Sequence, residues 1–201
     1  DNNNFFLKMS EEINQLRDVS NLESYFKKFL NKEFDLDSDI GLYSDVAKRE
    51  RNLIVITETP LIRDFRKGEI YSGQKKSLLD GIIFCIKLSL KEKDFGVILA
   101  PVLPLPIGEI SDQDRFSTYY SLFLDKLIRI INPMFLILIG ERSNNLIKKL
   151  GEIRGERNNS ANIPHLVIPE LQYILSVPET KKYIWDDLKN LIKRGKDESL
   201  L

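Results

Sequence analysis

The chain has 201 residues, which suffices for one α/β domain with a sizeable core and is too short for two full domains. Lysine plus arginine and aspartate plus glutamate each total 30, so the net charge attracts neither nucleic acid nor an anionic membrane, and any DNA contact needs a local basic patch. A hydrophobic fraction of 42% with 30% charged residues is typical of globular proteins and excludes disorder, collagen and coiled coils.

Cysteine usage and hydropathy limit the protein class further. The single cysteine, Cys85, forms no internal disulfide, and without partners it holds neither a structural zinc nor an iron–sulfur cluster. The longest apolar run, around residues 134–139, is far shorter than the roughly 20 residues of a membrane helix. The first residues lack the basic start and the apolar stretch of a signal peptide. We therefore expect a cytoplasmic monomer with no cofactor, no metal and no membrane contact.

The chain opens with two amphipathic segments that predict helices. Residues 10–17 form the first and residues 20–30 the second, in which Ser20 and Glu23 have the spacing of a capping box. We expect both helices to pack on the sheet of the body, as an N-terminal helical extension that covers residues 1–51.

The body, residues 52–194, contains four short apolar runs without polar interruption. Such runs are typical of strands that are buried on both faces, as in a parallel sheet. The predicted strands are residues 53–56, 97–99, 135–139 and 166–168. Residues 195–201 are predicted to form a frayed tail.

Segments with apolar residues at helical spacing separate these strands, and a polar loop at residues 58–73 precedes the first of them. The predicted helices are residues 78–86, residues 112–131 with Ser111 as cap, a shorter helix after Arg142, and residues 178–194. The last helix is predicted to face inward with Tyr183, Ile184, Leu188, Leu191 and Ile192. Strands that alternate with helices imply right-handed crossovers and mainly parallel pairing. The sequence therefore predicts a three-layer α/β/α sandwich with a central four-stranded, mainly parallel sheet.

Acidic residues follow three of the predicted strands, at the edge of a parallel sheet where ligands bind. They are Glu58, Glu141 and Glu170. Crowded carboxylates can act as an acid and a base or hold a metal, but acidic side chains in solvated loops are more common, and the spacing alone favours that interpretation. His165, the only histidine, has no partner for a catalytic triad and is interpreted as a structural residue at a strand edge. No glycine-rich phosphate loop supports an ATPase or a dehydrogenase.

Three pieces of sequence around the first strand stand in a distinctive order. Residues 57–61 are Thr-Glu-Thr-Pro-Leu, a charged stretch then ends in Tyr-Ser-Gly at residues 71–73, and residues 78–80 are Leu-Leu-Asp. This order resembles the first motif of the uracil-DNA glycosylase superfamily, bacterial family-four type, which reads Gly-Glu-Ala-Pro-Gly, then Gly-x-Pro-Phe-Val-Gly and a Leu-Leu-Asp helix. The spacing is intact, whereas some of the glycines are replaced.

Two further motifs resemble the same family. Residues 132–140 are similar to its Arg-Pro-Lys-Val-Leu-Val-Leu-Leu-Gly strand. Residues 170–178, Glu-Leu-Gln-Tyr-Ile-Leu-Ser-Val-Pro, stand where family members carry His-Pro-Ala-Tyr-Leu-Leu-Arg-Asn-Pro, and residues 181–188 resemble the Lys-Arg-x-x-Trp-x-Asp-Leu helix that follows. The resemblance covers about residues 53–193 and implies the uracil-DNA glycosylase-like form of the predicted sandwich.

The resemblance implies an enzyme that flips a uracil out of DNA, reads its edge, stacks an aromatic ring on its face and stabilises the departing uracil anion. The stacking aromatic residue corresponds to Tyr71. The asparagine that reads the base corresponds to Ala100, whose methyl group cannot read an amide. Together with Thr57 and Pro60, these two residues make up the base pocket that the resemblance predicts.

Further differences from the family motifs concern the residues of the chemical step and of the DNA contact. The histidine of the last motif, which stabilises the leaving group, corresponds to Glu170, whose negative charge opposes the charge that develops on the departing base. The terminal arginine of that motif, suited to a phosphate, corresponds to Ser176. Glu58 is retained, either as a catalytic carboxylate or as a cap on backbone amides of the motif loop. The cysteines of the family's iron–sulfur cluster are absent, so no cofactor is expected.

These departures lead to three hypotheses. In the first, the chain is a degenerate uracil-DNA glycosylase-like protein that excises no uracil and is kept for binding DNA or a protein. In the second, it is an active base-excision enzyme of altered base specificity, with Glu58 and Glu170 as a new acid–base pair. In the third, it is an interaction module whose N-terminal helices present a partner-binding face.

DNA contact, in the first hypothesis, rests on charge alone. The candidate phosphate contacts near the first motif are Arg63, Arg66, Lys67, Lys75 and Lys76, and further along the chain they are Lys148, Lys149, Arg154 and Arg157. The alternative is a solvated face, because acidic residues are interleaved among these basic ones.

Overall fold

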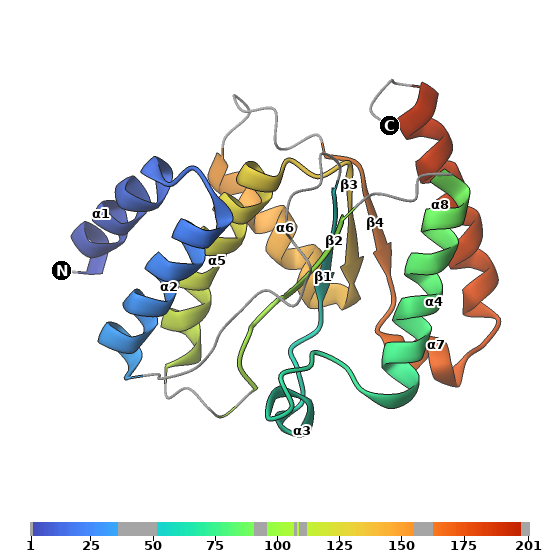
Figure 1. Ribbon diagram of the computed structural model, residues 1–201, viewed down its shortest axis with the longest axis horizontal. Coiled ribbons are helices and arrows are strands. Elements are labelled where there is room, and N and C mark those ends of the chain that lie inside the picture. The colour runs from blue at the N-terminus through green and yellow to red at the C-terminus, as the bar shows by residue number, and fades with distance from the viewer. Residues whose placement is uncertain are drawn as a thin grey trace.

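The structure is a computed structural model that describes residues 2–35, 52–90, 96–106, 108, 112–154 and 163–197. Four parallel strands form its centre, and helices flank them on both sides (Figure 1). They are β1 (Asn52–Thr57), β2 (Gly96–Pro101), β3 (Phe135–Ile139) and β4 (His165–Ile168), in the order β2-β1-β3-β4. The predicted α/β/α sandwich with a four-stranded parallel sheet is confirmed.

β1 lies inside the sheet, where Ile56 is opposite Ala100 of β2 on one side and Leu138 of β3 on the other. Every residue of β1 and β3 is buried, as their uninterrupted apolar runs predict. The two edge strands differ from these: Val97 and Leu99 of β2 are half-buried, and His165 and Val167 of β4 are exposed. The prediction that all four runs are buried on both faces is therefore right for β1 and β3 and wrong for β4, and β2 is buried only in part.

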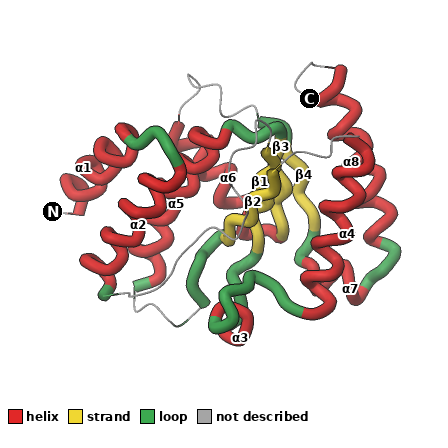
Figure 2. The backbone as a smooth tube through the Cα atoms, viewed as in Figure 1, coloured by secondary structure: helices red, strands yellow, loops and turns green. Residues whose placement is uncertain are grey.

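Two groups of helices cover the sheet (Figures 1 and 2). One face carries α5 (Gln113–Ile131) and α6 (Gly140–Arg154), with α1 (Asn2–Gln15) and α2 (Val19–Phe34) outside α5. The other face carries α4 (Gly73–Leu90), α7 (Leu171–Ser176) and α8 (Thr180–Asp197). A short helix, α3 (Ile62–Phe65), lies beyond the end of β1. None of the described helices combines the length and the apolar character that crossing a bilayer requires.

Side chains alternate along the strands between two cores, one on each face of the sheet. On β1, Ile54 and Ile56 belong to the core under α1, α2 and α5, whereas Leu53 and Val55 belong to the core under α4, α7 and α8. The first, the aromatic core, is rich in buried rings: Phe26, Phe29, Phe116, Tyr119, Tyr120 and Phe123. The second, the aliphatic core, consists mostly of leucine and isoleucine.

The N-terminal helices differ from the prediction in where they start and in what they contact. α1 begins at Asn2 rather than at residue 10. α2 begins at Val19, and its N-cap is Asp18, whose carboxylate accepts a hydrogen bond from the Asn21 backbone N–H at 2.8 Å. The predicted capping box is therefore wrong, because Ser20 lies inside the helix. Both helices make their main contacts with α5 rather than with the sheet, since their aromatic rings meet those of α5.

Several boundaries in the body also differ from the prediction. The N-cap of α5 is Asp112, which accepts a hydrogen bond from the Arg115 backbone N–H at 3.1 Å, while Ser111 lies outside the described residues. α3 interrupts the predicted polar loop, and α6 begins directly after β3. α8 continues to Asp197, inside the predicted frayed tail, and Tyr183 is 68% exposed rather than facing inward.

Candidate functional site

The three predicted acidic residues lie at one end of the sheet. Glu58 follows β1, Glu141 lies in the first turn of α6 after β3, and Glu170 lies between β4 and α7. All strands are parallel, so these positions meet beyond the same carboxyl ends, where open α/β sheets bind ligands. This end of the molecule, named the rim below, comprises residues 57–76 with the starts of α6 and α7.

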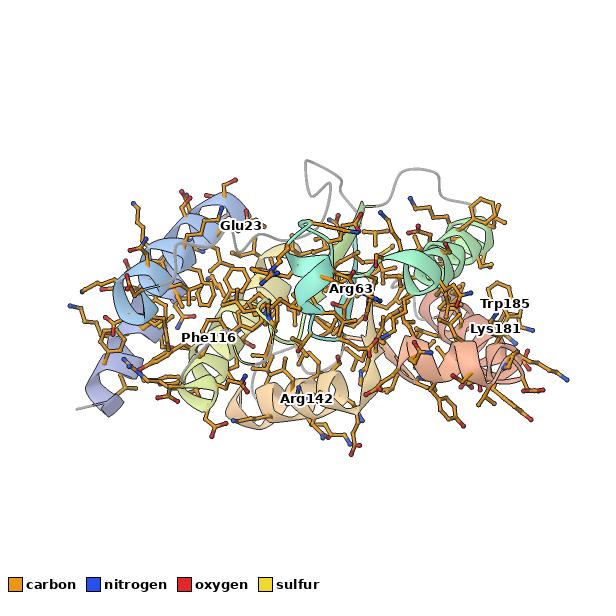
Figure 3. The ribbon with its side chains drawn as sticks, turned by 90° about the horizontal axis from the view of Figure 1, so that it is seen from below. Glu23, Arg63, Phe116, Arg142, Lys181 and Trp185 are labelled. Carbon is orange, nitrogen blue, oxygen red and sulfur yellow. The ribbon has the colours of Figure 1, made fainter. Side chains whose placement is uncertain are left out.

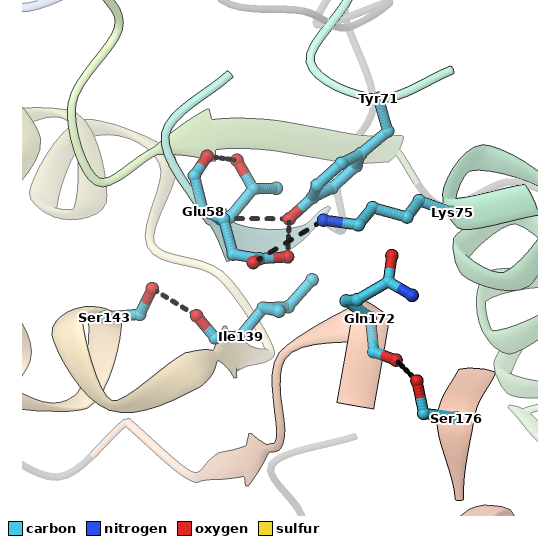
Figure 4. A network of polar contacts seen from close by, with 8 residues as sticks. Glu58, Tyr71, Lys75, Ile139, Ser143, Gln172 and Ser176 are labelled. Atoms are coloured by element: carbon cyan, nitrogen blue, oxygen red, sulfur yellow. Dashed lines mark hydrogen bonds and ion pairs between the residues drawn. The ribbon is translucent and has the colours of Figure 1, made fainter. Parts of the chain in front are cut away.

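At the rim, a tyrosine from the same loop holds Glu58. The Tyr71 hydroxyl accepts a hydrogen bond from the Glu58 backbone N–H at 3.0 Å and donates one to Glu58 Oε2 at 3.1 Å (Figure 4). Lys75 Nζ lies 4.0 Å from Glu58 Oε1 and 6.0 Å from the centre of the Tyr71 ring. One carboxylate oxygen therefore accepts a hydrogen bond, and a positive charge stands near the other.

Tyr71 packs into the aliphatic core and is only 6% exposed. Burial, followed by the negative charge of Glu58, raises the pKa of its hydroxyl above the ordinary value, so the hydroxyl stays protonated at neutral pH. The sequence leaves two roles open for this residue, a stacking surface for a flipped base and a packing residue under the loop. Its burial and its hydrogen bonds to Glu58 favour the second role.

The other predicted base-pocket residues are buried but are not all gathered around Tyr71. Thr57 is fully buried, and its hydroxyl donates to the Glu58 backbone carbonyl at 3.1 Å. Pro60 is buried as well. Ala100 is fully buried on β2 and belongs to the aromatic core, on the opposite face of the sheet from Tyr71. The structure thus brings Thr57, Glu58 and Tyr71 together and separates Ala100 from them.

Glu170 lies against the start of α6. A Cβ added to Gly140 would stand 3.1 Å from Glu170 Cγ, so the glutamate side chain passes directly over the glycine. Gly140 has a φ of 79°, in the left-handed region that favours glycine. Glu58 follows the end of β1 and Gly140 follows the end of β3, the neighbouring strand, so both residues lie at the same end of the sheet. Glu170 is exposed and makes no side-chain hydrogen bond to the start of α7.

Two serines near the rim donate to backbone carbonyls of their own segments. Ser143 donates to Ile139 at 2.7 Å, and Ser176 donates to Gln172 at 2.9 Å. Ser176, which stands in place of a phosphate-binding arginine, is therefore hydrogen-bonded within α7. The side-chain amide of Gln172 points toward the Lys75 side of the site (Figure 4).

Basic residues of α3 and the following turn extend into solvent beside this network. Arg63, Arg66 and Lys67 are exposed, and Figure 3 shows Arg63 between the two groups of helices. Arg63 lies 3.5 Å from Asp64, whereas Arg66 and Lys67 have no ion-pair partner among the described residues. Asp64 is buried and accepts a hydrogen bond from the Ser72 hydroxyl at 2.6 Å, which ties α3 to the start of α4.

Gln172 and Asp64 are rim residues that sequence reasoning did not single out, and Lys75 was expected as a phosphate contact rather than as a neighbour of Glu58. A weak signal exists for Lys75, because it lies four residues after Tyr71 and such pairs share a helix face. The helix starts only at Gly73, however, so the spacing by itself does not establish the contact. Asp64 carries no signal of its own, since nothing in the sequence distinguishes it from the charged residues around it.

The described residues contain no group of three or more histidine, cysteine or acidic side chains that could hold a metal ion. No protein-family model matches the chain, and no curated protein matches it either. The function has to be argued from the rim itself.

Proposed function

We propose that this protein is a uracil-DNA glycosylase-like protein that contacts DNA at the rim and does not excise uracil. The motif order of the sequence supports the family, and the state of Glu58 and Tyr71 supports the loss of excision. A cytoplasmic location belongs to the same proposal, because a single cysteine suits a reducing compartment.

The closed contact between Tyr71 and Glu58 carries the proposed loss of excision. A flipped base needs an open aromatic face to stack on and a polar group that reads its edge. Tyr71 is 6% exposed and uses its hydroxyl on Glu58, while Ala100 has no polar side-chain atom and faces the other core. Glu170 also puts a carboxylate at the end of the sheet where negative charge develops on a departing base, which raises the barrier.

DNA contact is supported by the charge of α3 and its following turn. Arg66 and Lys67 are exposed and have no acidic partner within the described chain, so both are available for phosphates. The carboxylates nearby have partners of their own: Glu58 and Asp64 accept hydrogen bonds, and Glu69 forms an ion pair with α4. These partners reduce the competition of the rim carboxylates for the two basic side chains.

The test is to incubate the purified protein with single- and double-stranded oligonucleotides that carry uracil, hypoxanthine or xanthine. Abasic-site formation and binding are measured in the same samples. We expect binding that weakens as salt rises, and no abasic sites from uracil. Excision of uracil would overturn the proposed loss of activity. A lack of binding to either kind of DNA would overturn the DNA contact and direct the search to protein partners.

Base excision of altered specificity is a second candidate, and the position of Glu170 favours it. Glu170 lies over Gly140 at the start of α6, and Glu58 follows β1, so both glutamates lie beyond the carboxyl ends of the sheet. Two carboxylates in different surroundings can divide the roles of acid and base. Glu58 has a hydrogen-bond donor and a cation beside it, whereas Glu170 is exposed.

The variant Glu170→Gln distinguishes the two candidates. For an enzyme of altered specificity, it abolishes cleavage of whichever damaged base the wild-type protein processes. For a protein that only contacts DNA, it leaves cleavage absent and slightly strengthens binding, because one negative charge is removed from the rim. Glu141→Gln is the matched control, since Glu141 is an exposed carboxylate at the neighbouring strand end.

A further inference from the structure

A hollow lies on the α4–α8 side of the molecule and is not lined by Glu58 or Tyr71. It is a groove of about 830 Å³ between α4, α7 and α8. Lys181 and Trp185 both line it, and Figure 3 shows them close together on α8. The mechanism argued for the rim uses none of the residues that line this groove.

The groove has an apolar body and one polar end. The body is lined by Leu78, Ile82, Ile184, Trp185 and Leu188, and the polar end by Gln74, Ser77 and Lys181. A volume of this size with a mostly apolar wall and a few polar groups at one place is typical of small-molecule sites. The polar end fixes the orientation that a ligand would take.

The polar end carries positive charge from three sources. α4 begins at Gly73 and α8 at Thr180, so two helix N-termini, each with a partial positive charge, meet there. Neither helix has an acidic residue in its first turn to neutralise that charge. Lys181 adds a full charge and has no ion-pair partner among the described residues. This arrangement is complementary to an anionic head group.

The room in the groove is not filled by the described chain. A Cβ added to Gly81, in the middle of α4, meets no atom within 4 Å, although glycine is unfavourable inside a helix. Cys85 lies one turn further along the same wall, so small side chains keep the groove open here. Beside it, Phe84 and Leu88 are each 62% exposed.

We propose that this groove binds a small organic carboxylate with an apolar chain. The carboxylate lies at Lys181 and the starts of α4 and α8, and the chain runs along Gly81 and Trp185. The part of α4 that lines the groove, residues 73–85, spans about 18 Å at about 1.5 Å per residue. This length is enough for a dodecyl chain. The groove adjoins the rim at Gly73 and Gln74 but is not lined by Glu58, Tyr71, Arg66 or Lys67, so this inference holds or fails independently of the proposed function.

Dodecanoate is the probe, and Trp185 reports its binding. Trp185 is the only tryptophan of the chain and lines the groove, so a ligand that enters changes its fluorescence. We expect a saturable change with dodecanoate below its micelle concentration and much weaker binding of dodecanol, which has the same chain without the charge. No saturable change, or equal affinities for the two compounds, would overturn the proposal.

Lys181→Gln and Lys182→Gln form a matched pair. Each removes one charge from the first turn of α8, yet only Lys181 lines the groove. We expect Lys181→Gln to weaken dodecanoate binding about tenfold, as for the loss of one charge-assisted contact, and to leave dodecanol unaffected. Lys182→Gln should change little. Equal losses in the two variants would contradict a defined carboxylate contact and overturn the assignment of Lys181.

Gly81→Leu tests the position of the chain without unfolding the protein. The space at Gly81 is open and leucine favours a helix, so circular dichroism should show an intact fold. We expect dodecanoate binding, measured by calorimetry, to be lost because the leucine fills the groove. Unchanged binding in the folded variant would overturn the placement of the ligand along α4.

Discussion

The two helical layers of this protein bury apolar surface in different ways. On one face, α1 and α2 add a second row of helices outside α5, and rings pack on rings, with the Phe26 and Phe123 centroids 4.7 Å apart. On the other face, α4, α7 and α8 cover the sheet with aliphatic side chains. There the described chain leaves a groove of about 830 Å³ and exposes Phe84 and Leu88.

The comparison shows that α5 buries far more of its side chains than α4 does. α5 packs on the sheet and on the N-terminal helices, and eight of its residues are buried. α4 packs on α7 and α8, yet just two of its residues, Leu79 and Ile86, are buried. The aromatic layer is therefore the more completely covered of the two at these helices, and the aliphatic layer keeps surface available for a ligand.

The largest expected loss of stability comes from a substitution in the aromatic core. Phe26 is 1% exposed and contacts several rings, so Phe26→Ala should lower the free energy of unfolding by about 3–5 kcal/mol. Phe84→Ala, the same substitution at a 62% exposed position of the other layer, should change it by less than about 0.5 kcal/mol. Urea denaturation of both variants measures the difference. Similar losses would contradict the contrast between the layers.

A second prediction concerns the contact between Glu170 and Gly140. Alanine at position 140 would be held at a φ of 79° and pressed against Glu170 Cγ, so Gly140→Ala should cost about 2 kcal/mol or more. Gly68→Ala is the control, since Gly68 has a φ of 69° with no atom near its added Cβ, and it should cost about 1 kcal/mol. Chemical denaturation compares them. Equal losses would show that Glu170 does not press on position 140.

Removing the Tyr71 hydroxyl should cost about 1 kcal/mol near neutral pH, because Tyr71→Phe loses both hydrogen bonds to Glu58. The folded state raises the pKa of this hydroxyl, chiefly through burial, whereas the unfolded chain releases the proton near pH 10.0. The contribution of Tyr71 is therefore complete below that pH and decreases as pH rises above it. The difference in the free energy of unfolding between wild type and variant should therefore shrink above pH 10.0. Urea denaturation repeated at several pH values in that range measures it. A gap that is constant with pH would contradict the buried, protonated hydroxyl.

The smallest expected effect is a gain in stability rather than a loss. Gly81→Ala should raise the free energy of unfolding by about 0.5–1 kcal/mol, because alanine restricts the unfolded chain and meets no atom in the open groove. Thermal unfolding detects a shift of this size. A loss of stability would mean that the wall of α4 is already filled.

Much of the body could be predicted from sequence, because burial patterns there repeat at fixed spacing. The stripe of α5, from Phe116 to Ile128, is buried as its helical spacing indicates, and the runs at residues 53–56 and 135–139 are buried strands. Helix starts are less predictable. Both Asp18 and Ser20 are suitable caps by residue type, and only the extended backbone at Asp18 decides between them.

The candidate site could be predicted only in part. Parallel topology was enough to place Glu58, Glu141 and Glu170 at one end of the sheet. The contact between Glu58 and Tyr71 was not predictable, because it depends on the path of the loop that contains α3. The separation of Ala100 from Tyr71 depends on the face of β2 to which Ala100 points and on the path of the loop before α4, and the resemblance alone fixes neither.

The most direct test of the proposed function is the salt dependence of DNA binding, measured by fluorescence anisotropy with a uracil-containing single strand. Wild type is compared with Arg66→Gln/Lys67→Gln at the rim and with Lys148→Gln/Lys149→Gln on α6, four exposed basic residues. We predict that the rim variant binds more weakly, with a salt slope smaller by about 1–2, and that the α6 variant binds like wild type. Undetectable wild-type binding, or equal losses in the two variants, would contradict a DNA contact at the rim.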